Sequence, residues 1–305
     1  MSREISRKVI RRLLEVSAVF LLSGMSLLHA CESKLPPGAS ARADEFIKEG
    51  KAWKAYGAMN IEASKGSGGA YRYLATMLEK GRGVERSAFA ARQLNWMGSQ
   101  YHDADAMFHA AKDFYARGHR NDGDDLAERA VRCGHPEAAL LLAERRAMEG
   151  RASEALTFLT LAIEASLPRA KYFLAEVYDK GSLGLPKDYE RAFYWYSLAA
   201  KDGIAEAKSA MAYYFVRGLH GQQDDLAALH WYHEAAKGGH VDSMTAYGWM
   251  LMTGKGASVD IGEASYYLSL AAKNGDKQAA KFLKEIKMKR DERIQLSASP
   301  ALKND

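Results

Sequence analysis

The ten residues YWYSLAAKDG at 194–203 return as HWYHEAAKGG at 230–239 and as YYLSLAAKNG at 266–275. The copies lie 36 residues apart, and self-similarity at that period is typical of stacked helix–turn–helix units. Looser units, in which a helix-ending residue is followed four positions later by Ala, extend the pattern toward the N-terminus. They lie at Gly66/Ala70, Gln100/Ala104, Gly134/Ala138 and Ser166/Ala170. We therefore expect an all-α fold, an α-solenoid of about six to seven stacked antiparallel helix pairs.

Each copy carries its own start and stop signals. An Asp precedes every copy, where a carboxylate can accept hydrogen bonds from the first backbone N–H groups of a helix. A Gly ends every copy and can adopt the left-handed conformation that terminates a helix. Between them, Ala192, Tyr196 and Ala199 form an apolar stripe on one helix face. The expected caps are Asp188, Asp224 and Asp260, and the expected terminators are Gly203, Gly239 and Gly275.

The loop and helix motifs resemble those of a known repeat family. Gly81-Arg82-Gly83-Val84 follows YLATMLEK, and WY with a later AAK and Gly recurs in the last copies. These motifs are similar to Sel-one-like repeats, relatives of the tetratricopeptide repeat. Residues 170–203, 207–239 and 243–275 fit that pattern best, and residues 104–166 resemble more generic tetratricopeptide-like units. The resemblance covers residues 45–290 and implies a scaffold that binds other proteins.

Composition and charge limit the classes of function. The chain has 305 residues, of which 48% are hydrophobic and 27% charged, as in a folded protein. Of the net charge of +5, residues 1–30 contribute five basic and two acidic side chains. The rest of the chain is nearly neutral, whereas nucleic-acid binding requires a basic stripe. We therefore expect no nucleic-acid partner.

The N-terminal 30 residues have the features of an export signal. A basic stretch precedes the apolar run at 16–28, which is shorter than the ~20 residues that span a membrane. The following Leu28-His29-Ala30-Cys31 resembles the lipobox of bacterial lipoproteins. That resemblance implies cleavage before Cys31, lipidation of its thiol and anchoring to a membrane. The alternative is an ordinary signal peptide that is followed by an unrelated Cys.

These features predict the domain organisation and the location of the protein. Residues 1–30 form the signal peptide, residues 31–42 the lipidated Cys and its tether, residues 43–290 the solenoid and residues 291–305 a disordered tail. We expect a periplasmic protein that is lipid-anchored at the outer membrane, because the residue after Cys31 is Glu rather than Asp. If Cys31 carries lipid, Cys133 has no cysteine partner and packs as a small apolar residue.

Candidate chemical sites are weak. His230, His233 and Glu234 share a helix face, but zinc usually has three or four protein ligands, and the equivalent positions hold Tyr and Ser. NDGDD at 121–125 lacks the spacing of a calcium loop, so Asp124 or Asp125 is interpreted as a helix cap. No nucleophile–base pair is apparent. We expect no enzymatic activity, no metal, no cofactor and no small-molecule substrate.

A binding surface is the more promising feature. One helix position aligns Thr76, Glu176, Tyr213 and Trp249, so its polarity varies between units. Exposed aromatic side chains dominate the energetics of many protein interfaces. The candidates for a partner-binding patch are Tyr213, Trp249, Tyr214 and Met250. The open alternative is that these side chains pack between adjacent units.

The leading hypothesis is a lipid-anchored scaffold that holds proteins of an envelope assembly, such as polysaccharide export, secretion or conjugation machinery. Its partners would be other envelope proteins and, through Cys31, the membrane itself. The alternative hypothesis is a soluble periplasmic regulator that binds and restrains a signalling receptor.

Overall fold

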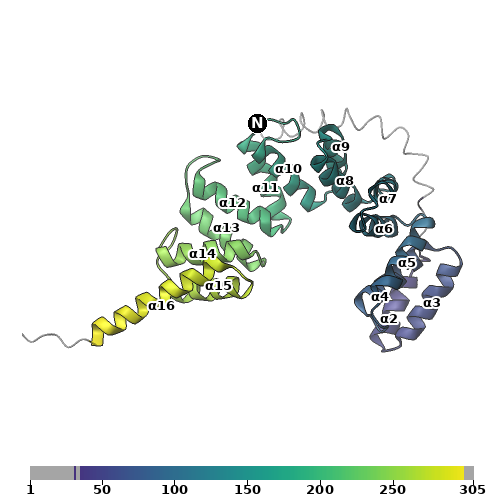
Figure 1. Ribbon diagram of the computed structural model, residues 1–305, viewed down its shortest axis with the longest axis horizontal. Helices are drawn as coiled ribbons and strands as arrows, with labels where there is room; N and C mark the ends of the chain where they lie inside the picture. Colours follow the sequence, from purple (N-terminus) through teal and green to yellow (C-terminus); the bar gives the residue numbers. More distant parts are fainter. Residues whose placement is uncertain (1–30, 32–34, 299–305) are drawn as a thin grey trace, which may run out of the picture. The chain divides into compact units, whose positions relative to one another are not determined.

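The computed structural model describes residue 31 and residues 35–298. Residues 1–30, 32–34 and 299–305 lie outside this part of the chain, and with them the expected signal peptide and the end of the tail. Within the described ranges the chain is helical, without strands, as expected (Figure 1). None of the helices there is long and apolar enough to cross a bilayer. The helices are α2 (Ala39–Lys48), α3 (Ala52–Ser64), α4 (Gly68–Lys80), α5 (Ala88–Gln100), α6 (Ala104–Ala116), α7 (Arg120–Arg132), α8 (Pro136–Met148), α9 (Ala152–Glu164), α10 (Pro168–Lys180), α11 (Tyr189–Lys201), α12 (Ala205–Arg217), α13 (Asp225–Lys237), α14 (Val241–Thr253), α15 (Ile261–Lys273) and α16 (Lys277–Ala298).

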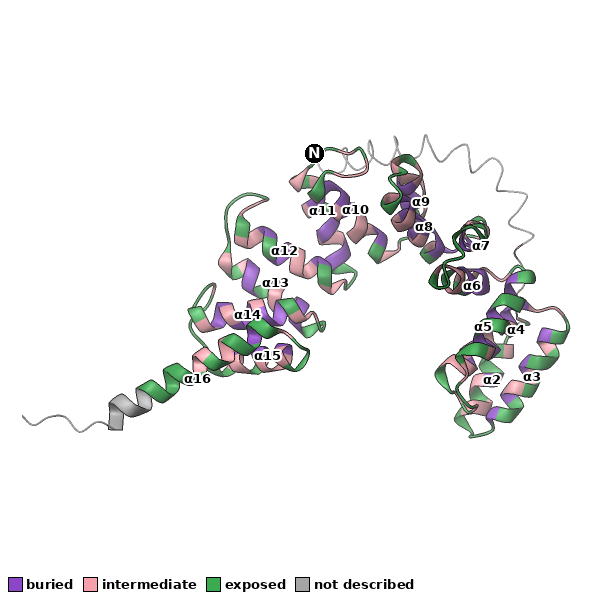
Figure 2. Ribbon diagram, in the orientation of Figure 1, coloured by how far each residue is buried: buried purple, intermediate pink, exposed green. Residues whose placement is uncertain are grey.

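The described residues divide into two compact units. The N-terminal unit ends at Leu167 and contains α2–α9, and the C-terminal unit begins at Pro168 and contains α10–α16. In each unit consecutive helices pack as hairpins: α4 on α5, α6 on α7 and α8 on α9 in the first, and α10 on α11, α12 on α13 and α14 on α15 in the second. We call α4, α6, α8, α10, α12 and α14 the first helices. Within each unit, buried residues line the faces between neighbouring helices, so a hairpin relies on its neighbour in that unit for its core (Figure 2).

A residue with positive φ makes the turn that leads into each first helix. Glycine occupies most of these turns, but His102 (φ 60°) and Ser166 (φ 61°) take the same conformation, which costs a non-glycine residue about 1 kcal/mol. Four positions after each turn lies a small residue that is fully buried: Ala70, Ala106, Ala138, Ala170, Ala207, Ser243 and Ala279. The turn and the buried Ala of the second repeat are therefore His102 and Ala106. The expected pair, Gln100 and Ala104, was wrong by two residues.

The expected helix caps in the strongest copies are confirmed. Asp188, Asp224 and Asp260 accept hydrogen bonds from backbone N–H groups three residues later, at 2.9, 2.9 and 2.8 Å. Among the caps that were not predicted are two histidines, His135 and His240, which use Nδ1 to accept the same bond at 3.1 and 3.2 Å. Any side chain with a suitably placed acceptor can satisfy these orphan N–H groups.

Asp124 and Asp125 do not cap a helix, because α7 begins earlier and includes both. Asp124 instead accepts a hydrogen bond from the Tyr115 hydroxyl at 2.7 Å and pairs with Arg146 at 3.0 Å. The interpretation of NDGDD as a cap was therefore wrong.

Two helix boundaries also differ from the expectation. The helix α2 begins at Ala39, inside the stretch that we assigned to the tether. The last helix, α16, continues to Ala298, so residues 291–298 are helical rather than disordered.

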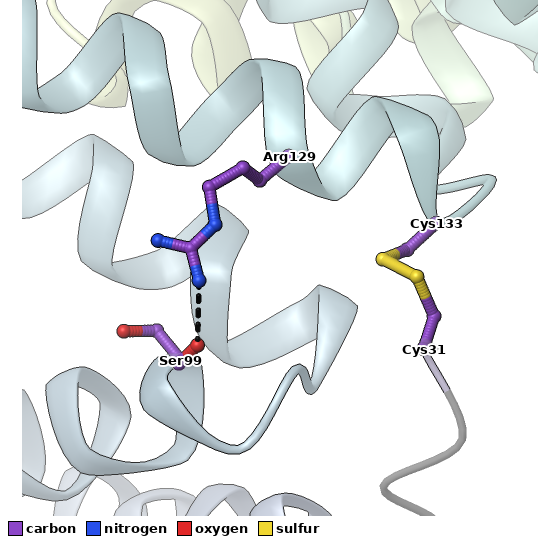
Figure 3. The surroundings of a disulfide bond; sticks show 4 residues. All are labelled: Cys31, Ser99, Arg129 and Cys133. Carbon is purple, nitrogen blue, oxygen red and sulfur yellow. Dashed lines mark hydrogen bonds between the residues drawn. A yellow bond between two sulfur atoms is a disulfide. The ribbon is translucent and has the colours of Figure 1, made fainter. Parts of the chain in front are cut away.

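The expectation that Cys133 has no cysteine partner was wrong. Cys31 and Cys133 form a disulfide, with their Cα atoms 5.6 Å apart (Figure 3). Cys133 follows α7, whose Arg129 Nη2 donates a hydrogen bond to the Ser99 carbonyl oxygen at 3.4 Å beside the disulfide. The bond joins residues 102 positions apart and encloses α2–α7 in one covalent loop. The spacing of two cysteines in a repeat sequence did not indicate this proximity.

An ionised aspartate connects the last helix to its neighbour. Asp276 accepts hydrogen bonds from Thr245 Oγ1 at 2.6 Å and from the backbone N–H groups of Gln278 and Ala279 at 2.7 and 3.0 Å. The Thr245 bond lowers the pKa of Asp276 more than burial raises it. Because the folded pKa lies below the unfolded one, the stabilisation is present above the unfolded pKa and is lost as the pH falls through the folded value.

We therefore expect Asp276→Ala to lower the free energy of unfolding of the C-terminal unit by about 1 kcal/mol at pH 7. The difference from the native chain should shrink as the pH falls below about 4. Urea denaturation at a series of pH values measures it. A difference that stays constant down to pH 2.5 would show that the carboxylate charge plays no part.

Candidate protein-interaction surfaces

The predicted patch splits into exposed and buried members. Tyr213 on α12 is 48% exposed, and the corresponding Trp249 on α14 is half-buried and packs against the buried cluster that includes Tyr247 and Leu251. Lys255 Nζ lies 5.1 Å from the centre of the Trp249 ring, so this indole carries a cation–π contact. Tyr213 and Trp249 therefore offer aromatic surface on successive first helices of the C-terminal unit.

Tyr214 and Met250 cannot contribute to a surface patch. They are 2% and 1% exposed, because each follows Tyr213 or Trp249 by one residue and so lies about 100° further around the helix. The Tyr214 hydroxyl donates a hydrogen bond to Asp179 at 2.5 Å, and burial followed by this bond raises the pKa of Tyr214. For these two residues the alternative of packing between units is the correct one.

Of the residues that were considered for metal binding, His230 is exposed, and His233 and Glu234 make other contacts. The ring of His233 stacks on Tyr247 at 4.6 Å between centroids, and its Nε2 lies 3.1 Å from the Tyr267 hydroxyl. Glu234 pairs with Lys237 and, at 3.6 Å, with Lys208. Among the described residues no three His, Cys, Asp or Glu side chains come together in a way that could hold a metal ion.

A second exposed aromatic face was not predicted. On α5, Phe89 is 64% exposed and Trp96 is 50% exposed, and the two are seven residues, or about two turns, apart. They border a groove of about 330 Å³ between α5 and α6, which has Ala110 at its floor. The alignment covered only positions of first helices, Thr76, Glu176, Tyr213 and Trp249, so the side chains of α5 were not considered.

Comparison with known proteins identifies the repeat. Residues 69–94, 168–204, 205–240 and 241–276 match the family model of the Sel1 repeat. The chain contains Sel1 repeats. Three of the four match the units that the sequence motifs indicated most strongly, and the matched segments leave out residues 95–167, where the loop glycines are lost.

Two crystal structures resemble this Sel1-repeat chain. A protective antigen present in uropathogenic Escherichia coli strains, which displays an SLR fold, is 26% identical, with a TM-score of 0.67 over 82% of this chain and 56% of that one. A Sel1 repeat protein from Oxalobacter formigenes is 23% identical, with a TM-score of 0.67 over 77% of this chain and 97% of that one. The chain thus spans little more than half the length of the Escherichia coli antigen. A search of curated protein sequences finds no match.

These findings confirm the expected repeat family and the expected solenoid of stacked helix pairs. Sel1 repeats generally mediate protein–protein interactions, and the fold is a non-catalytic interaction scaffold. Tyr213 and the half-buried Trp249 are the two predicted patch residues that reach the surface, and Phe89 and Trp96 on α5 form a second exposed aromatic face.

Proposed function

We propose that this chain is an exported, non-enzymatic scaffold that holds other proteins of a bacterial envelope assembly, such as polysaccharide export, secretion or conjugation machinery. The observation that carries the proposal is the stack of Sel1 repeats with Tyr213 and Trp249 on successive first helices. The disulfide supports export, because disulfides persist in oxidising compartments such as the periplasm. Bacterial Sel1-repeat proteins are often periplasmic, which agrees with this location.

In the leading form of the proposal, Cys31 carries the lipid that anchors the scaffold to the outer membrane. The support is the sequence Leu28-His29-Ala30-Cys31, of which only Cys31 belongs to the described residues. A thioether to lipid uses the same sulfur atom as the disulfide. A given molecule therefore carries one or the other.

The disulfide favours a second candidate function, a soluble periplasmic regulator that binds and restrains a signalling receptor. In this form Cys31 is joined to Cys133 and no thiol is left for acylation. The repeat surfaces are the same in both forms, and only the attachment of the chain to the membrane differs.

Matched cysteine variants separate the two forms. If the scaffold is lipid-anchored, the native chain and Cys133→Ser should stay in the membrane fraction, and only Cys31→Ser should become soluble. If the regulator form is correct, all three proteins should be soluble. Both variants should then lose the faster-migrating species on a non-reducing gel. Membrane retention of all three would contradict both attachments.

The binding patch is tested by affinity purification from intact envelopes. Truncating a central aromatic side chain in an interface typically costs about 2 kcal/mol, or about 30-fold in affinity. We expect Trp249→Ala and Tyr213→Ala to lose the captured proteins by a factor of this size. Tyr266→Ala is the control, because Tyr266 is an exposed aromatic residue on α15, outside this patch. Unchanged capture by both patch variants would eliminate the patch.

A further inference from the structure

The groove between α5 and α6 exists because one core side chain of the repeat is missing. Counted from the turn, the position of Ala110 is occupied in the other first helices by large residues that are all buried: Leu74, Leu142, Leu174, Met211 and Tyr247. Only α6 has alanine there, and the hollow above its methyl group opens toward α5. Such a departure from the packing of five other helices leaves apolar surface uncovered at one place in the N-terminal unit.

The same groove contains charged residues where the other units are apolar. Asp113 occupies a position that is apolar in four of the other first helices, namely Met77, Val177, Tyr214 and Met250. Arg92 on α5 corresponds to Phe193 on α11 and Leu229 on α13, although α15 has Ser265 at this position. Asp113 and Arg92 together place charge next to the hollow.

Two arginines converge on this single carboxylate. Arg92 Nε lies 3.4 Å from Asp113 Oδ1, and Arg117 Nη2 lies 2.5 Å from Asp113 Oδ2. The Arg92 and Arg117 side chains are 49% and 53% exposed, whereas that of Asp113 is 20% exposed. One carboxylate balances only one of the two guanidinium groups, so the rim of the groove has an excess positive charge that faces solvent.

The aromatic side chains hold these arginines and extend the apolar surface. The guanidinium carbon of Arg117 lies 4.9 Å from the centre of the Phe114 ring, and that of Arg92 lies 6.0 Å from the centre of the Phe89 ring. A guanidinium over the face of a ring is attracted to it and keeps its N–H groups in its own plane, where they can bind a carboxylate with two hydrogen bonds. Trp96 completes the edge of the groove and is half exposed.

We propose that this groove binds an acidic peptide segment of a partner protein. An aliphatic or aromatic side chain of the peptide fills the hollow above Ala110, and a neighbouring Asp or Glu binds Arg92 and Arg117. Charge complementarity selects the acidic residue, and the volume left by the missing core side chain selects the apolar one. This inference rests on the proposed function as a protein scaffold, and it adds a second binding site and the chemistry of its occupant.

The proposal is tested by selecting random peptides that bind the purified full chain. Peptides of about twelve residues are long enough, because the groove spans only about two helix turns. We expect the selected peptides to be enriched in Asp and Glu next to Leu, Ile, Phe or Trp. The strongest binder is then synthesised, labelled and titrated against the native chain and its variants. Selection of basic peptides, or of none, would overturn the proposal.

Three variants locate the binding site. Ala110→Leu restores the side chain that the other first helices carry, so it should fill the groove, keep the fold and weaken peptide binding at least 10-fold. Arg92→Glu combined with Arg117→Glu should weaken binding to the same extent without filling the groove. Trp53→Ala removes an exposed aromatic side chain from α3 in the same unit, and it should leave the affinity unchanged.

Affinity that is unchanged in Ala110→Leu and in the double arginine variant would overturn the proposed site. The outcome is separate from that of the scaffold proposal. If envelope proteins are still captured through Trp249 while the groove variants bind peptide normally, the groove is wrong and the scaffold function stands.

Discussion

Replacing Gly256 by Ala should lower the free energy of unfolding of the C-terminal unit by about 3 kcal/mol or more, since backbone strain and overpacking add. Gly256 lies in the loop between α14 and α15 with φ 77°. A Cβ atom at this position would lie 2.2 Å from the carbonyl oxygen of Asp225, the first residue of α13. Backbone cannot move aside as a flexible side chain can, so the loop or the start of α13 must shift.

A matched glycine separates the clash from the conformational cost. Gly239 has φ 89°, and a Cβ there would meet nothing within 4 Å. Gly239→Ala should therefore cost only the left-handed strain of about 1 kcal/mol. Urea denaturation followed by circular dichroism measures both variants. Equal losses in the two would show that the loop does not press against the preceding hairpin.

The close approach of Gly256 to Asp225 explains why the loop motif Gly-x-Gly has a second glycine. In the N-terminal unit the corresponding Gly83 lies against Ala52, the first residue of α3, and an added Cβ would come within 2.1 Å of the Ala52 side chain. Each of these loops thus touches the start of the second helix of the preceding hairpin. The sequence motif Gly-x-Gly therefore reports a contact between successive units as well as a turn within one.

The repeat itself could be predicted because its signals are local and recur. An Asp cap, an apolar stripe and a terminating Gly lie within one helix, and their recurrence at a fixed spacing excludes chance. The prediction of the repeat positions failed in the repeat around His102, where other residues replace these signals. His102 takes the turn conformation without being glycine, and HDADA at 102–106 offers Ala at two positions two residues apart. The unit was therefore placed at Gln100/Ala104, and the groove at Ala110 could not be recognised as a missing core residue.

The position of a residue around its helix decides whether its side chain is exposed, and a shift of one residue can change the outcome. Tyr213 and Tyr214 are adjacent and chemically identical, yet one faces solvent and the other the core. The alignment placed Tyr213 and Trp249 in one column, and their side chains are exposed and half-buried respectively. The error was to extend the patch to the next residue, which belongs to the column of Met77 and Val177.

Cys133→Ser should lower the free energy of unfolding of the disulfide-bonded protein by about 3–4 kcal/mol. The disulfide joins residues 102 positions apart, and closing so long a loop restricts the unfolded chain more than a short loop would. The effect should be confined to the N-terminal unit, which holds both cysteines. The C-terminal unit, from Pro168, should keep its own stability, because none of its helices lies in the covalent loop.

The measurement uses protein that is exported to an oxidising compartment and purified without reductant. Urea unfolding should show a lower midpoint for Cys133→Ser than for the native chain, and Cys31→Ser should coincide with it, because either change opens the same loop. Dithiothreitol should bring the native midpoint to that of the variants. Identical midpoints for the native chain with and without reductant would mean that Cys31 is not joined to Cys133 in solution, and its thiol would then be the candidate for the lipid.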